Sequence, residues 1–164
     1  MNNLLIYAIF IGIGATIVMD LFALLLLKIF GIPSLNYALV GRWIGGFSQG
    51  KFTCPNIIQA HSVRGEHAIG WAAHYSIGIA FALVLLLIEG LQWVDQPTLL
   101  PALIVGVLTT VAPFFIMQPA FGFGFAASKT PKPTIARLRS LQAHTVYGVG
   151  LYLAGLLLSM LIKY

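Results

Sequence analysis

Two histidines lie inside apolar segments, where an ionisable side chain is unusual. His74 lies within AHYSIGIAFALVLLL and His144 within AHTVYGVGLYLAGLLL, and in each segment a glycine follows the histidine four residues later. Asp20 interrupts another apolar run. Ionisable residues inside a membrane are costly, face the protein interior and mark proton or ligand sites. The chemistry that these three residues suggest is proton exchange, since the unperturbed pKa of histidine is about 6.5, or metal ligation.

The composition indicates that the solvent of this chain is lipid. Of its 164 residues, 59% are hydrophobic and only 8% are charged, and the mean hydropathy is +0.94. Soluble domains carry about 25% charged residues. Four runs reach the roughly 20 apolar residues that cross a bilayer, and none alternates as barrel strands do. We therefore predict an all-α membrane protein, a four-helix transmembrane bundle that forms a single domain over residues 1–164, with helices at about 4–27, 68–88, 99–117 and 141–162.

The two histidine motifs also predict an internal repeat. Each follows a basic connection, and each connection follows a helix that runs in the opposite direction. We expect two parallel helix-pair repeats, residues 1–95 and 96–164, related by an axis along the membrane normal.

Small residues recur at a spacing of four on every predicted helix, and this spacing lets membrane helices approach closely. Asp20, His74 and His144 share these faces, so we expect them to point into the bundle. A rise of about 1.5 Å per residue places all three roughly 8–12 Å inside the cytoplasmic boundary, in one buried polar layer. Leu85 lies off the small-residue face and is expected to face lipid. The predicted helix-packing residues are Gly12, Thr16, Gly70, Gly78, Gly106, Thr110, Ser140 and Gly148.

Charge predicts the orientation. Eight of the nine Lys and Arg residues lie in or beside two connections, one between the first two helices and one between the last two. The positive-inside rule places both connections in the cytoplasm and both termini in the periplasm. Residues 35–47 have apolar side chains four apart, which suits a short interfacial helix, although a connector anchored by its tryptophan fits as well. The residues expected at lipid headgroups or the interface are Arg42, Trp43, Lys129, Lys132, Arg137 and Arg139.

Several function classes lack their motifs. The basic residues are spread over two connections without a recognition motif, so we expect no nucleic-acid binding. Gly122 and Gly124 could wrap a phosphate with backbone amides, but a lipid headgroup contact is the favoured interpretation. No catalytic residue is identified, because Ser76 lies two residues from His74 and residues two apart on a helix do not face each other. We do not expect an enzyme.

Motifs along nearly the whole chain resemble those of one protein family. They are GATIVMDLFALLL, YALVGRWIGG, RGEHAIGWAAHYSIGIAFA, QPTLLPALIVG, APFFIMQPAFGFGFAAS and TPKPTIARLRSLQAH. The chain resembles a family of short bacterial inner-membrane proteins classed only as a domain of unknown function. The resemblance implies a multi-pass helical protein of the bacterial inner membrane and supplies no catalytic residue.

Three interpretations of the polar layer remain open. The protein is structural or accessory, needs no cofactor, and has another membrane protein or itself, as a homodimer, as its partner. Alternatively, it is a small proton-coupled carrier that acts as an oligomer. In the third interpretation, His74 and His144 bind haem, or join Asp20 on a divalent metal.

Overall fold

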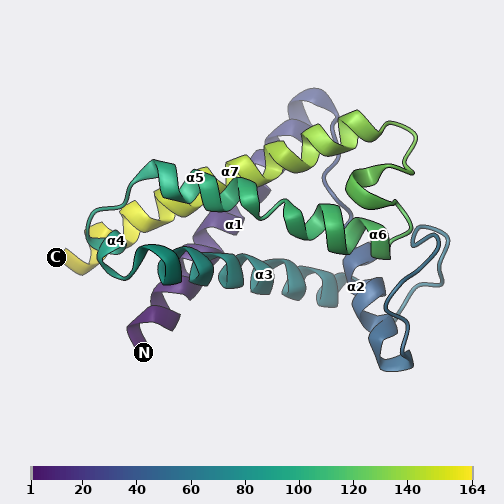
Figure 1. Ribbon diagram of the computed structural model, residues 1–164, viewed down its shortest axis with the longest axis horizontal. Coiled ribbons are helices and arrows are strands. Elements are labelled where there is room, and N and C mark those ends of the chain that lie inside the picture. The colour runs from purple at the N-terminus through teal and green to yellow at the C-terminus, as the bar shows by residue number, and fades with distance from the viewer. Residues whose placement is uncertain (1, 164) are drawn as a thin grey trace. The chain divides into compact units, whose positions relative to one another are not determined.

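Every regular element of the described residues is a helix, and no strand is present among them (Figure 1). The computed structural model describes residues 2–163 and, from residue 3 on, their side chains. The helical elements confirm the predicted all-α class. The α-helices are α1 (Asn2–Phe30), α2 (Tyr37–Gly45), α3 (Glu66–Glu89), α4 (Gln92–Asp95), α5 (Leu99–Leu108), α6 (Gln118–Ala120) and α7 (Pro133–Lys163), and the short elements are the 3-10 turns η1 (Gly46–Gln49) and η3 (Phe125–Ala127) and the π-helical turn η2 (Pro113–Met117).

Four helical segments are long and apolar enough to cross a membrane, which confirms the predicted number of spans. They are Asn3–Phe30, Glu66–Glu89, Leu99–Ala120 and Pro133–Lys163. The fourth helix begins at Pro133, eight residues before the predicted start at about residue 141. The prediction was wrong there because TIARLRSL is not apolar, although proline suits the first turn of a helix and the residues that follow are mostly good helix formers.

The third span is interrupted. Pro113 and Pro119 have no backbone N–H, so two helical hydrogen bonds are missing from this segment. The backbone between them widens into the π-helical turn η2, where the N–H of Gln118 reaches the carbonyl of Pro113. Such π turns are rare and often occur at functional sites.

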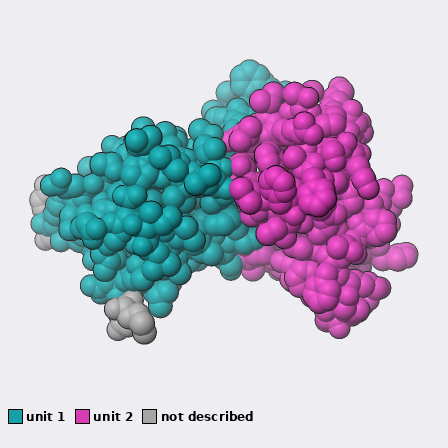
Figure 2. All heavy atoms as spheres, viewed as in Figure 1, with its two compact units in different colours: residues 1–34, 75–109, 142–164 teal, residues 35–74, 110–141 magenta. Residues whose placement is uncertain are grey.

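The chain divides into two compact units, coloured separately in Figure 2. Of the described residues, unit 1 comprises 2–34, 75–109 and 142–163, and unit 2 comprises 35–74 and 110–141. Each unit draws on both halves of the chain. The single domain and the two sequential repeats stay predictions.

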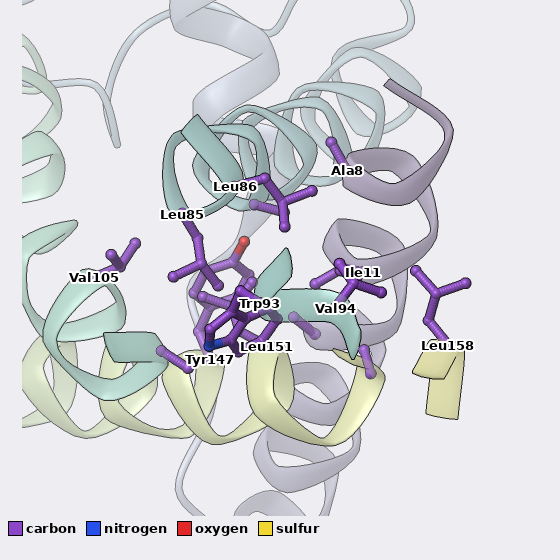
Figure 3. Close-up of a cluster of buried hydrophobic side chains, with 14 residues drawn as sticks. Ala8, Ile11, Leu85, Leu86, Trp93, Val94, Val105, Tyr147, Leu151 and Leu158 are labelled. Atoms are coloured by element: carbon purple, nitrogen blue, oxygen red, sulfur yellow. The ribbon is translucent and has the colours of Figure 1, made fainter. Parts of the chain in front are cut away.

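The core of unit 1 is apolar and almost fully buried. Leu85, Leu86, Trp93 and Leu151 lie within it, and their side chains converge with the ring of Tyr147 (Figure 3). Leu85 has an exposed fraction of 0%, so the expectation that it faces lipid is wrong. It lies seven residues after Gly78, which is two helical turns, and therefore shares the face that it was expected to leave.

Unit 2 has its own smaller core around Phe121, Ile57 and Val40. Backbone bonds join its two segments, because Cys54 N–H donates to the carbonyl of Ala120 at 2.7 Å and Ile57 N–H to that of Phe121 at 3.1 Å. The predicted short helix in the first connection is present as α2. Its location at the membrane interface stays a prediction.

Candidate functional site

Helices α1 and α3 cross where both carry small residues. A Cβ atom placed on Gly12 would lie 2.5 Å from the Cα of Ile79, and one on Gly78 would overlap the hydroxyl of Thr16. The Thr16 hydroxyl is satisfied within α1, since it donates to the carbonyl of Gly12 at 2.7 Å. Only glycine allows the two backbones this approach.

Asp20 lies one turn beyond Thr16 on the same helix, inside the first span. The hydroxyl of Tyr75 on α3 donates to its carboxylate at 3.0 Å. Thus a hydroxyl donor from a second helix meets the carboxyl group that the sequence placed in the membrane. Sequence reasoning missed Tyr75, although it follows His74 directly and carries a hydroxyl within an apolar run.

His144 lies at a second crossing, between α5 and α7, which run side by side in Figure 1. A Cβ on Gly106 would be 2.5 Å from the Cα of Gly148, and 2.8 Å from the carbonyl oxygen of His144 itself. The imidazole Nδ1 of His144 lies 2.7 Å from the hydroxyl of Thr109. The sequence singled out the neighbouring Thr110, which is buried, and missed Thr109.

The hydrogen bonds of Thr109 favour one tautomer of His144. The hydroxyl has one proton, and it donates that proton to the carbonyl of Gly106 at 2.5 Å. With its proton used there, the hydroxyl accepts from Nδ1–H of His144. In the neutral imidazole the proton then resides on Nδ1, and Nε2 is the basic atom.

His74 belongs to unit 2, whereas Asp20 and His144 belong to unit 1. Its ring stacks on Tyr37, with 4.1 Å between the ring centroids, and meets the edge of Trp71 at 5.8 Å. The structure thus gives His74 an aromatic setting within its unit. The shared layer of Asp20, His74 and His144 stays a prediction.

A third close crossing, in unit 2, joins α2 to the first turn of α3. A Cβ on Gly41 would overlap the carbonyl of Glu66, and one on the predicted packing residue Gly70 would overlap the carbonyl of Tyr37. Beside it, Arg42 Nε donates to a Glu66 carboxylate oxygen at 2.9 Å, and a terminal nitrogen of the same guanidinium donates to the other oxygen at 3.0 Å. The hydrogen bond to Glu66 raises the pKa of the Arg42 guanidinium above its usual value.

Arg42 also fixes the connection that follows α2. Its remaining terminal nitrogen donates to the carbonyls of Ile57 and Ala60, at 3.0 and 2.9 Å. The neighbouring Trp43 donates its indole N–H to the carbonyl of Phe52 at 2.7 Å. Arg42 and Trp43, two of the six residues predicted at lipid headgroups or the interface, thus make bonds within the chain, and their contact with lipid stays a prediction.

A buried amide lies at the end of the interrupted third span. Gln118 is 6% exposed, and its Nε2 reaches the hydroxyl of Ser140 at 3.4 Å. Its Oε1 has no hydrogen-bond partner in the described part of the chain, and neither does the buried indole nitrogen of Trp93 in unit 1. Turning the amide by 180° would exchange the two atoms and still leave one of them unbonded.

Within residues 2–163, the structure holds no group of three or more His, Cys, Asp and Glu side chains placed to bind one metal ion. The arrangement offers instead two hydrogen-bonded polar pairs, Asp20–Tyr75 and His144–Thr109, each formed between helices of unit 1. Such pairs hold helices together. An acid or a base within a pair exchanges protons only where a proton path connects it to water.

A family model with the description "Protein of unknown function (DUF2938)" matches residues 9–158. No curated protein and no solved structure matches the chain.

Proposed function

We propose that this chain, which belongs to the family described as "Protein of unknown function (DUF2938)", is a membrane protein of structural or accessory type. Its four candidate spans make it a protein of the membrane class. In this proposal the polar side chains within the spans hold helices together and do not transport or transform a substrate.

One observation carries the proposal: two of the three intramembrane ionisable residues are hydrogen-bonded to a second helix beside a glycine crossing. Asp20 accepts from Tyr75 on α3, and His144 donates to Thr109 next to Gly106. In lipid, an unsatisfied polar group is costly, so such bonds favour one packing of the helices over others.

We further propose the bacterial inner membrane as its location, with both termini periplasmic. The support is the distribution of Lys and Arg, together with the family resemblance in the motifs. As partner we propose a second copy or another membrane protein, because membrane helices associate through van der Waals packing and interhelical hydrogen bonds.

A proton-coupled carrier is the second candidate, and the tautomer of His144 favours it. A neutral imidazole whose Nδ1–H is held by Thr109 would take up a proton at Nε2. A carboxylate and an imidazole in one membrane domain could then pass a proton between them.

Purified protein in liposomes separates these candidates. The structural role predicts a proton-flux rate equal to that of empty liposomes and a lower melting temperature for Tyr75→Phe. Flux above that background, abolished in Asp20→Asn, would replace the structural role with the carrier. An absorption spectrum and a metal analysis of the same sample test the third interpretation, since a haem Soret band or a stoichiometric metal would assign His74 and His144 as ligands.

A further inference from the structure

The two units differ sharply in charge. Unit 2 contains seven of the nine Lys and Arg residues of the chain but only one of its four acidic residues, Glu66. Unit 1 contains Lys28 and Lys163 with the other three acids. Unit 2 therefore has a formal net charge of +6 and unit 1 one of −1, which together give the +5 of the chain.

The single acid of unit 2 is already neutralised. Glu66 forms its ion pair with Arg42, and both side chains are largely buried. The other six cations of unit 2 are exposed, and none of them pairs with a carboxylate among the described residues. They are Lys51, Arg64, Lys129, Lys132, Arg137 and Arg139. A surface with six such cations attracts anions.

Four of these cations lie on one short stretch together with exposed apolar side chains. We call residues 125–139 the basic segment. Phe125, Ile135 and Leu138 are 64%, 44% and 60% exposed there, between and beside the cations. The segment is held in shape because Arg137 Nε donates to the carbonyl of Ala126 at 2.8 Å, which joins η3 to the first turns of α7.

We propose that the basic segment binds the phosphate headgroups of anionic phospholipids. Lys and Arg beside a membrane are attracted to acidic lipids, while exposed aromatic and aliphatic side chains enter the boundary between headgroups and acyl chains. A soluble phosphate would use the cations but not the exposed Phe125 and Leu138. The inference rests on the proposed membrane location.

Lipid binding in a neutral detergent tests the proposal. Native mass spectrometry counts bound phosphatidylglycerol, which is anionic, against phosphatidylcholine, which is zwitterionic and of similar chain length. The wild type is expected to prefer phosphatidylglycerol. Lys129→Gln with Lys132→Gln should reduce this preference by up to about fivefold per lysine. Lys28→Gln with Lys163→Gln removes the same charge from unit 1 and should leave the preference unchanged.

Equal loss in both double variants, or no preference in the wild type, would overturn the proposal. A second measurement needs no variant: raising the salt concentration should weaken phosphatidylglycerol binding, because exposed charges are screened. Soluble glycerol phosphate at the same concentration should not displace the lipid, and displacement would assign the segment to free phosphate instead. Binding of polyglutamate in place of the lipid would assign it to an acidic protein.

Failure of the proposed membrane location is distinguishable from failure of the lipid proposal. Alkaline carbonate extracts a peripheral protein from membranes but leaves a spanning protein in the pellet. A chain that stays in the pellet and yet shows no lipid preference contradicts only the lipid proposal.

Discussion

Asp20 shows how a carboxyl group inside a membrane span is made tolerable. A carboxylate in lipid needs donors, and Tyr75 supplies one from a neighbouring helix at 3.0 Å. The types of these residues were visible in the sequence, but their pairing was not. Residues 20 and 75 are joined by the crossing of α1 and α3, and that geometry depends on Gly12 and Gly78, which lie elsewhere on the same helices.

The Asp20–Tyr75 bond should be measurable as a coupling energy. Tyr75→Phe leaves the carboxyl group without this donor, so we expect a loss of about 1–3 kcal/mol in the free energy of unfolding. The same substitution in an Asp20→Leu background should cost less than half as much, because no carboxyl group remains to be satisfied. Thermal and chemical denaturation of the four proteins in detergent gives the values. Tyr7→Phe on α1 is the control, and equal costs of Tyr75→Phe in both backgrounds would show that the bond contributes nothing.

Arg42 depends on its shape as well as its charge. Its guanidinium reaches both oxygens of Glu66 and two backbone carbonyls at once, which a lysine ammonium cannot do. Arg42→Lys should therefore reduce the free energy of unfolding by about 1–3 kcal/mol. Arg64→Lys, at an exposed position of the same unit, should change it by less than about 0.5 kcal/mol. Equal effects of the two substitutions in a denaturation series would mean that charge alone matters at position 42.

Among the elements, sequence prediction succeeded where hydropathy determines the bounds of a helix. It failed where backbone chemistry or tertiary contacts determine where a helix begins or is interrupted. The first two spans were predicted to within three residues of their observed ends, since apolar runs with polar flanks define them. The interruption of the third span depends on Pro113, Pro119 and the π turn between them, which hydropathy does not register. The first turns of α7 are helical but polar, so a prediction based on apolar runs starts the helix several residues after its true beginning at Pro133.

The crossing of α1 and α3 gives a prediction at the scale of elements. Gly78→Leu must push the helices apart, because a Cβ alone already overlaps Thr16, and we expect a cost above about 3 kcal/mol. Ser76→Leu is the matched small-to-large change on the exposed face of α3 and should be nearly neutral. Melting temperatures in detergent compare the two. A larger loss for Ser76→Leu would place the helix contact on the other face.

On the scale of the whole molecule, apolar length and charge determine different properties: the first the number of spans, the second the orientation of the chain in the membrane. Apolar length gives four candidate spans, and four spans would bring both termini to the same side of a membrane. It does not say which side. In the proposed orientation the seven basic residues of unit 2 determine the side, because segments rich in Lys and Arg stay in the cytoplasm.

Reporter fusions at both ends test the number of spans and the orientation separately. Alkaline phosphatase fused to either terminus should be active, because it folds only in the periplasm, and a green fluorescent protein at the same positions should be dark. A fusion of either reporter after Lys132, within the basic segment, should give the opposite result and serves as the internal control. Termini on opposite sides would contradict the four spans themselves. Both termini in the cytoplasm would preserve the spans and overturn the orientation, which would then have to be determined by something other than the seven basic residues of unit 2.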